Sequence, residues 1–274
     1  MDPMEGYQPS TYGDRFVDVY DDWYGAITDT TACVETVTEL ARQSRSSRRS
    51  DLDGTTPSPR VLELGVGTGR LAIPMTGNGL DVTGVDASAA MLSALAAKPG
   101  GERVRTVVAD MVDPPVAAGF DLVLIAYNTL FNLTAPGDQA RCLARVAGLL
   151  APTGRLVVEA FVPDPATGQG DAVSTRQVSV DRVVLSVSRT DPAGQQVHGQ
   201  YVDITEAGVK LRPWQIRWAT PDQIDEQAAE AGLARVARWS DWERGTFTSD
   251  SSSHVSVYEP VRPRGDTPTE QAGT

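Results

Sequence analysis

Short apolar runs alternate with longer amphipathic runs in the first two thirds of the chain. The apolar runs are rich in valine and leucine, which is typical of strands buried on both faces, and lie at 60–64, 81–86, 104–109, 120–126 and 155–161. Between them the pattern predicts helices at about 68–77, 88–97 and 137–150. Strands and helices that alternate in this way predict a mostly parallel sheet with right-handed crossovers, and so a doubly wound α/β core.

The region before this core shows a helical pattern with an aromatic face. Phe16, Tyr20, Trp23, Tyr24 and Ile27 recur at spacings of three and four, which predicts one helix over about 14–41. Residues 1–11 are expected to be disordered. The basic, serine-rich stretch 42–49 is expected to be a solvated linker.

The pattern changes again after about residue 165. A loop is expected at 166–173, followed by runs of alternating polar and apolar residues that predict an antiparallel meander at 178–190, 195–205 and 209–218. A helix is expected at 221–233, with Thr220 as its N-cap and Pro221 at its first position. Two strands near 234–240 and 253–260 can then close the first sheet.

These patterns divide the chain into five segments. They are an N-terminal lid helix with a linker (1–57), an α/β core (58–165), an antiparallel insert (166–220), a returning helix with two strands (221–261) and a flexible tail (262–274).

Composition narrows the classes of partner. The 274 residues are 41% hydrophobic and carry a net charge of −12, which argues against a nucleic-acid partner because phosphate binding needs clustered Lys and Arg. Two cysteines, Cys33 and Cys142, and two histidines, His198 and His254, favour neither a disulfide framework nor a metal site. The sequence shows no secretory signal and no apolar run long enough to span a membrane, so a cytoplasmic location is expected.

The motif ELGVGTG follows the first expected strand and enters the first expected helix. Gly65, Gly67 and Gly69 suit a tight turn that lets a ligand approach the backbone. A dinucleotide site usually spaces its glycines as GxGxxG, but the sixth position here is Arg70. The spacing is instead GxGxG, preceded by the acidic Glu63.

Acidic residues also follow the next two strands. Asp86 ends the second strand, where a carboxylate can accept two hydrogen bonds from a ribose diol, and Asp110 and Met111 end the third. Each acid also has a plain structural explanation. Glu63 can pair with a nearby group, Asp86 can cap the next helix, and Asp110 can start a turn before Pro114. Ligands of open parallel sheets bind at the edge where these residues meet, so their order along the chain favours an adenosine ligand.

In this order the motifs resemble those of the class I S-adenosylmethionine (SAM) dependent methyltransferases. The resemblance covers about residues 58–163, and includes FDLVLIAYNTLFNL at 120–133 and LLAPTGRLVVEAF at 149–161. The N-terminal YGDRFVDVYDDWYG and the antiparallel run are similar to the lid helix and the substrate-covering insert of bacterial small-molecule N-methyltransferases. Members of that group act on amino sugars, glycine or peptide N-termini.

The resemblance implies SAM as the cofactor and S-adenosylhomocysteine (SAH) as its product. In the family, the acid after the third strand faces the adenine amino group, and its neighbour donates a backbone N–H to the ring. The implied cofactor-binding residues are Tyr20, Tyr24, Glu63, Gly65, Gly67, Gly69, Asp86, Ala87, Met91, Asp110, Met111 and Ala126.

Methyl transfer in such a family mainly requires the protein to align the acceptor with the methyl group and to exclude water. The aromatic face of the N-terminal helix is expected to cover the cofactor, although its rings can equally serve as anchors to the sheet. Candidates for moving a proton or orienting the acceptor are Glu159, Tyr127, Asn128 and His198. Glu159 can instead form a structural ion pair, and His198 can be an ordinary strand residue without a catalytic role.

The stretch RPWQIRW in the insert places Arg212, Trp214 and Trp218 on one face of a strand and Arg217 on the other. That strand suits a substrate pocket, an oligomer interface or plain core. The candidate substrate residues are therefore Arg212, Trp214 and Trp218, together with Trp23 and Phe131.

The sequence therefore predicts a SAM-dependent methyltransferase for a small molecule or short peptide of secondary metabolism. Nitrogen is the favoured acceptor, and oxygen and carbon stay open. The rivals are an NAD(P)-dependent oxidoreductase and a non-catalytic SAM-binding protein. No nucleic acid, membrane or metal is expected as a partner, and the chain is expected to be a monomer or a homodimer formed through the insert.

Overall fold

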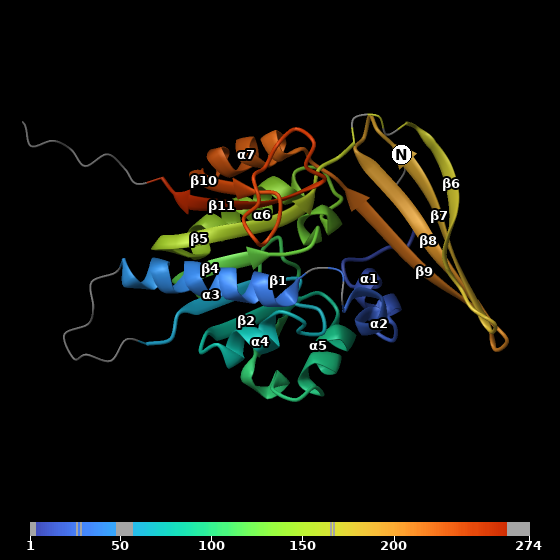
Figure 1. The fold of residues 1–274 in the computed structure, drawn as a ribbon, viewed down its shortest axis with the longest axis horizontal. Coiled ribbons are helices and arrows are strands. Elements are labelled where there is room, and N and C mark those ends of the chain that lie inside the picture. Colours follow the sequence, from blue (N-terminus) through green and yellow to red (C-terminus); the bar gives the residue numbers. More distant parts are fainter. Residues whose placement is uncertain are drawn as a thin grey trace, which may run out of the picture.

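The computed structural model describes residues 4–25, 27, 29–47, 57–164, 166 and 168–261, and within them the chain forms two separate sheets (Figure 1). The larger, seven-stranded sheet has the order β10-β11-β5-β4-β1-β2-β3. Its strands are β1 (Arg60–Leu64), β2 (Asp81–Asp86), β3 (Arg105–Val108), β4 (Phe120–Ile125), β5 (Leu150–Phe161), β10 (Leu233–Trp239) and β11 (Ser253–Pro260). Strands β1 to β5 are parallel, and β11 and β10 join antiparallel beside β5.

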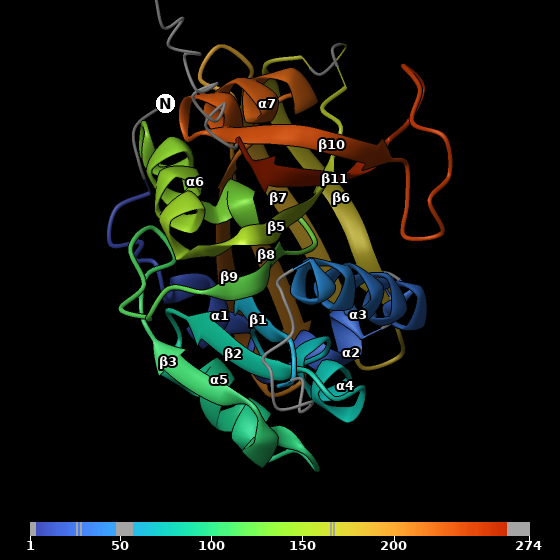
Figure 2. The same cartoon turned by 90° about the vertical axis from the view of Figure 1, so that its left-hand side faces the viewer.

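Helices cover both faces of this sheet (Figure 2). One face carries α3 (Thr30–Ser46), α4 (Ala72–Gly77) and α5 (Ala89–Ala96), and the other carries α6 (Asp138–Leu149) and α7 (Pro221–Glu230). Two short 3₁₀ turns, η1 (Gly101–Arg103) and η2 (Thr129–Asn132), follow α5 and β4. The predicted doubly wound α/β core is thus confirmed.

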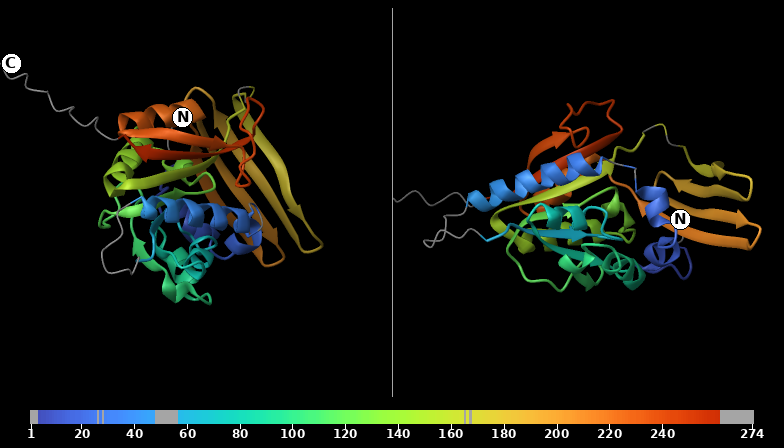
Figure 3. Two further views of the ribbon diagram at one scale, coloured as in Figure 1. Left: turned by 60° about the vertical axis from the view of Figure 1, so that its left-hand side comes forward. Right: turned by 60° about the horizontal axis from the view of Figure 1, so that its bottom comes forward.

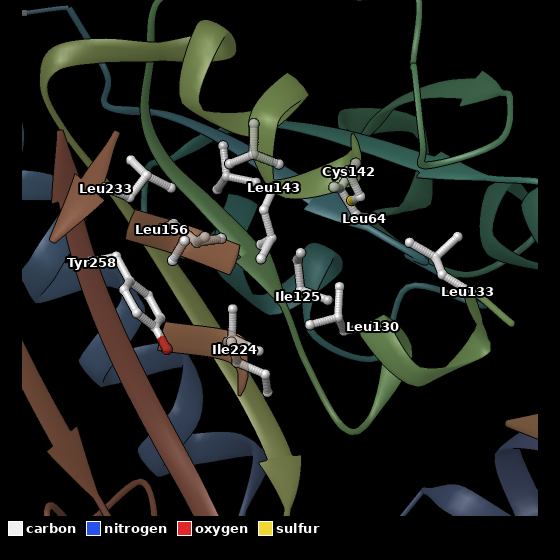
Figure 4. Packing of buried hydrophobic residues seen from close by; sticks show 14 of the residues in the cluster. Leu64, Ile125, Leu130, Leu133, Cys142, Leu143, Leu156, Ile224, Leu233 and Tyr258 are labelled. Carbon is white, nitrogen blue, oxygen red and sulfur yellow. The ribbon is translucent and has the colours of Figure 1, made fainter. Parts of the chain in front are cut away.

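The central strand β4 explains why this core is stable. Its six residues are all buried: Val123 and Ile125 belong to the cluster with α6 and α7, while Leu122 and Leu124 belong to the cluster on the opposite face. Figure 4 shows Ile125 in the first of these clusters. Each fully buried aliphatic side chain contributes about 1.5–3 kcal/mol, so the two clusters stabilise the sheet and fix the positions at which its strands end.

The N-terminal region differs from its prediction. The single helix expected over 14–41 is wrong, because the chain forms α1 (Thr11–Phe16), α2 (Tyr20–Tyr24) and then α3. The Asp29 carboxylate accepts a hydrogen bond from the Ala32 amide at 2.9 Å and so caps a new helix at this point.

The two flanks of that region also need correction. Residues 4–10 are described as turns that lead into α1, so the disorder predicted for 1–11 is wrong for them, and residues 1–3 lie outside the described part of the chain. The linker predicted at 42–49 is helical through Ser46, where Ser44 is buried, while the rest of the linker, residues 48–56, is outside the described residues. The tail predicted at 262–274 is likewise outside them.

The second sheet confirms the antiparallel meander but has one more strand than predicted. Its strands are β6 (Gly170–Val178), β7 (Arg182–Asp191), β8 (Gln196–Thr205) and β9 (Gly208–Arg217). The loop expected at 166–173 is wrong from Gly170 onward. Strand β6 is exposed along its whole length, so the burial that usually reveals a strand is missing from its sequence.

The insert stands at one end of the core, with α1 and α2 between it and the main sheet (Figures 1 and 3). Strand β9 contacts both α1 and η2. The chain returns to the core through Thr220, whose side chain accepts from Gln223 in a capping box, with Pro221 at the first position of α7. The predicted cap is therefore confirmed, although α7 ends at Glu230 rather than at 233. No helix in the described ranges combines the length and the hydropathy needed to cross a bilayer.

Candidate active site

A cavity of about 270 Å³ lies where β1, β2 and β3 end, beneath the N-terminal residues. Its floor is the glycine loop after β1, and its wall is the ends of β2 and β3. The sequence-predicted residues in its lining are Tyr20, Gly65, Gly67, Asp86, Ala87, Met91, Asp110 and Met111.

The glycine loop leaves room for a ligand against its backbone. Gly67 adopts a φ of +54°, which favours glycine, and a Cβ there would point to the ring of Tyr20 at 3.6 Å. The space above Gly67 is therefore bounded on its far side by an aromatic ring of the N-terminal region.

Asp86 is held rigidly at the end of β2. One carboxylate oxygen accepts from the Gly67 amide and the other from the Ser88 amide, both at 2.8 Å. Burial raises the pKa of Asp86, and these two amides oppose that rise. Each oxygen keeps a further lone pair, so the carboxylate at the cavity wall can still accept hydrogen bonds from a diol.

Residues 4–25, which we call the lid, dock on the core through carboxylates. The Ser88 hydroxyl donates to Asp14 at 2.6 Å, and the Thr68 hydroxyl donates to Asp21 at 2.6 Å. Lys98 also pairs with Asp21 at 2.7 Å. Burial alone would raise the pKa of Asp21, but these hydrogen bonds lower it, so the lid carries a negative charge at this contact.

The lid meets the insert through a network of charges. Arg212 is 3% exposed, and its guanidinium donates to Asp18 in the lid and to Asp203 in β8. Arg182 binds the same Asp203 with two hydrogen bonds, at 2.7 and 2.6 Å. The hydrogen bond from Arg212 lowers the pKa of Asp18 strongly. Arg212, a candidate substrate residue, thus joins the lid to the insert.

Glu63 lies beneath the glycine loop, outside the cavity lining. It is 4% exposed, and its Oε2 has no hydrogen-bond partner among the described residues. Burial raises its pKa to about 8, while the charge of Arg70 lowers it. A buried carboxyl of this kind stays largely protonated at neutral pH.

The ends of β4 and β5 are tied together. Tyr127 and Asn128 have φ angles of +42° and +62°, which are uncommon away from glycine. The Tyr127 amide donates to Glu159 Oε2 at 2.8 Å, and the Asn128 side chain accepts from the Phe161 amide at 2.7 Å. Burial raises the pKa of Glu159. Asn128 therefore acts as a brace, and Glu159 is held in the interior at the end of β5; neither these two residues nor Tyr127 line the cavity.

A group of aromatic rings connects these parts. The ring of Tyr24 lies 5.0 Å from Tyr20 and 6.3 Å from Tyr127, and Tyr201 of the insert lies 5.4 Å from Trp23. Trp214 packs beside Tyr201 at 6.0 Å. Burial raises the pKa of Tyr24 to about 12, so its hydroxyl stays protonated. This group of rings, which we call the aromatic cover, thus joins the core, the lid and the insert.

Some predicted site residues lie elsewhere. Phe131 is fully buried beside Phe161, and Trp218 is 9% exposed within the same hydrophobic cluster, so neither lines the cavity. His198 lies on the face of β8 away from Tyr201 and Asp203. Gly69 and Ala126 also lie in the interior outside the cavity lining, as do the buried Tyr24, Glu159 and Arg212.

Sequence reasoning missed part of the cavity wall. Tyr7 lines it from the segment that was expected to be disordered and Tyr12 from α1, while Thr134 and Gln215 line it from the loop after η2 and from β9. Two aromatic residues in a short polar segment were the available signal for the first pair. Burial raises the pKa of Tyr7 to about 12.

The arrangement fits the nucleoside part of SAM. Asp86 presents free lone pairs for a ribose diol, and the methionines Met91 and Met111 offer apolar walls for a base. Gly67 leaves its backbone open, and Tyr20 covers that space. Asp110 also accepts from the Val112 amide at 2.9 Å, so it holds its own turn while it lines the cavity.

Comparisons with known proteins identify the family of the chain. The sequence matches the methyltransferase domain family over residues 61–154. It is 31% identical over 255 residues to cypemycin N-terminal methyltransferase from a Streptomyces species, and the match covers 92% of this chain and 98% of that protein.

Solved structures give the same result. The CcbJ methyltransferase from Streptomyces caelestis is similar with a TM-score of 0.82 and 34% identity, over 93% of this chain and 100% of that one. SAM-bound CalS10, an amino pentose methyltransferase from Micromonospora echinaspora, shares the fold with a TM-score of 0.60 and 19% identity, over 94% and 99% of the two chains. The family rules out the nicotinamide alternative, and the chain belongs to the class I SAM-dependent methyltransferases.

Proposed function

We propose that the chain methylates a nitrogen atom of a small molecule or short peptide in secondary metabolism. The observation that carries this proposal is Glu159, a buried carboxyl with a raised pKa at the end of β5, beside the aromatic cover. An amine must lose a proton before it attacks, and a carboxylate of raised pKa accepts that proton more readily than a free glutamate. The name of the cypemycin relative, an N-terminal methyltransferase, supports the same acceptor.

The residues divide the work between two sides of the site. Bound SAM supplies a methyl group activated by its positive sulfur. On the cofactor side Asp86 accepts from the ribose, and Gly67 and Tyr20 enclose the space over the loop. On the acceptor side Glu159 accepts the proton, and the Tyr127 amide fixes its orientation. The aromatic rings exclude water, which strengthens these contacts.

A binding experiment tests the cofactor side. Calorimetry with SAH on the intact chain is expected to give micromolar affinity, which the Asp86→Ala variant weakens at least tenfold because both its amide contacts and the diol contact are lost. Asp81→Ala, at the exposed opposite end of β2, is the matched control and is expected to bind like the parent. Equal affinity in all three proteins would contradict the assignment.

A turnover experiment tests the acceptor atom. Peptides and amino sugars are offered beside their N-acetylated and hydroxyl counterparts, and SAH release is measured. Free amines are expected to react, with a pH profile that shifts when Glu159 is replaced by Gln. Turnover only on hydroxyl or carbon acceptors would favour the O- or C-methyltransferase alternative, and SAH binding without any turnover would favour a non-catalytic SAM-binding protein.

We also propose that the insert mediates a homodimer. The strand register places aliphatic residues in rows across the face of the insert that points away from the core: Val178, Val183, Ile204 and Val209 in one row, and Leu185, Val202 and Leu211 in the next. Figure 1 shows no other element on this face. On this face Val178, Val209 and Leu211 are 70%, 60% and 54% exposed, so apolar area is available for an interface, of which a stable one buries about 800 Å² per partner.

A second copy is the occupant that this face fits. Two antiparallel faces with aliphatic rows can pack on each other as the sheets of a sandwich do, and the charged residues Arg189 and Asp171 on the same face pair with each other. Sedimentation is expected to show a dimer that Val202→Lys dissociates. Val180→Lys, at the exposed hairpin tip between β6 and β7, is expected to leave it intact. A monomeric parent chain refutes the proposal.

We further propose a cytoplasmic location without a nucleic-acid partner. Both cysteines are buried and unpaired, as expected in a reducing compartment, and the net charge of −12 opposes binding to phosphate backbones. Fractionation of producing cells checks the location.

A further inference from the structure

Three arginines of the insert gather around one tryptophan of the lid. Their guanidinium carbons lie 4.5 Å (Arg176), 5.7 Å (Arg182) and 5.6 Å (Arg212) from the ring centre of Trp23. Such a concentration of positive charge is unexpected in a chain with a net charge of −12.

Two of these arginines are neutralised and one is not. Asp203 and Asp18 pair with Arg182 and Arg212. Arg176 pairs with no carboxylate of the described residues, and its hydrogen bond is a long one of 3.4 Å to the carbonyl of Trp23. One positive charge is therefore left over beside the aromatic rings.

The backbone directs Arg176 toward those rings. The pairing of β6 with β7 shifts register between Thr175 and Gln177, so Arg176 is the extra residue of a β-bulge, a device that re-aims a side chain. Its guanidinium also lies 5.4 Å from the ring of Tyr24 and 5.1 Å from that of Tyr201. Stacking uses the flat face of a guanidinium and leaves its N–H edge free to donate.

The position connects Arg176 to the reaction site. Tyr24, under the guanidinium, packs beside both Tyr20 and Tyr127; the Tyr20 ring borders the glycine loop, and the Tyr127 backbone amide is hydrogen-bonded to Glu159. An acceptor that reaches from Glu159 along these rings ends at Arg176.

We propose that Arg176 binds a carboxylate of the acceptor substrate, which makes the substrate class amines that carry a carboxyl group, such as amino acids or peptides. This proposal rests on the proposed function. One free guanidinium edge matches the two oxygens of one carboxylate, whereas a phosphate dianion calls for more donors than this position offers. The rings hold the guanidinium in place before the substrate arrives, which lowers the entropic cost of binding.

The test compares two probes that differ only in charge. Sodium benzoate and benzamide are titrated into the SAH-loaded chain, and tryptophan fluorescence is followed because Trp23 lies under Arg176. Benzoate is expected to bind at least tenfold more tightly than benzamide. Arg176→Gln is expected to abolish this preference, and Arg176→Lys to retain only part of it, since lysine keeps the charge but not the bidentate edge.

Arg189→Gln is the matched control, because Arg189 is another exposed insert arginine and is already paired with Asp171 at 2.7 Å. It is expected to keep the preference of the parent. Equal binding of both probes by the parent, or a preference that survives in Arg176→Gln, overturns the proposal. SAH affinity is measured separately for every protein and tests the proposed function independently. The benzoate titration is also repeated without SAH, so that it still tests binding at Arg176 if SAH does not bind.

Discussion

Gly13→Ala offers a sharp test of how the lid lies on the core. An alanine in place of a helical glycine normally stabilises a protein by about 1 kcal/mol, because glycine loses more backbone freedom on folding. Here the new Cβ would lie 2.5 Å from Ser88 Cβ and 3.0 Å from Met91 Cγ. Ser88 is fully buried and caps α5, so it has no room to yield.

The magnitude follows from these two opposing effects. Overpacking against rigid neighbours costs about 1–3 kcal/mol, which exceeds the helical gain. The net loss of about 1–2 kcal/mol weakens the docking of the lid. Because Tyr7, Tyr12 and Tyr20 of the lid line the cavity, we expect the same free energy to be lost from cofactor binding. The dissociation constant for SAH is expected to rise about 5- to 30-fold.

Calorimetry with SAH measures this change, and thermal unfolding reports on the core. Gly148→Ala in α6 is the matched control, since a Cβ there meets no atom within 4 Å. It is expected to leave SAH affinity unchanged and to stabilise the fold slightly. If Gly13→Ala bound SAH as tightly as the parent, the lid would not rest on Ser88 in the bound state, and the reasoning would fail.

Three further changes probe single side chains of β1, the insert and α7. Because burial raises the folded-state pKa of Glu63 to about 8, its contribution to stability is present below pH 4.5 and is lost as the pH rises through 8. The free energy of unfolding in urea is therefore expected to favour Glu63→Gln over the parent, and this advantage is expected to grow by a few kcal/mol as the pH rises from 5 to 9. Arg212→Met leaves the buried Asp203 with one cation fewer, and the free energy of unfolding is expected to fall by about 3 kcal/mol in the same assay. The exposed Lys210→Met is the control, and a fall of less than about 1 kcal/mol is expected for it. Thr220→Ala removes the capping box of α7, and unfolding is expected to become about 1 kcal/mol easier; an unchanged denaturation midpoint contradicts that role.

The core was predictable because its strands are buried on both faces. The apolar runs that became β1, β2 and β4 match the structure to within one residue, since each keeps a mostly apolar run although one buried polar residue, Glu63, Thr83 or Asp121, lies inside it. The lid was not predictable as one helix, although its aromatic spacing is real. Its rings meet three different surfaces, so the chain bends between α1 and α2 instead of presenting one continuous face.

The candidate site was predictable where it depends on strand ends. Asp86, Asp110 and the glycine loop reach the cavity because parallel strands end at one edge. The same reasoning could not identify Arg176 as a site residue. Its strand lacks the alternating burial that reveals a strand in sequence, and its direction depends on a bulge that only the pairing of β6 with β7 shows.

The acidic residues of the lid determine what a pH profile of the enzyme can report. Asp18 and Asp21 have lowered pKa values because cations of the insert and the core bind them, so both stay charged at neutral pH and lose their partners only as the pH falls through those low values. The lid is thus docked throughout the range in which an enzyme of this kind is assayed. Glu159 has a raised pKa and titrates closer to neutrality. A loss of methyl transfer on acidification, at pH values still above the lowered pKa values of Asp18 and Asp21, therefore reports protonation at the acceptor side, whereas a parallel loss of SAH affinity would show that the lid opens first.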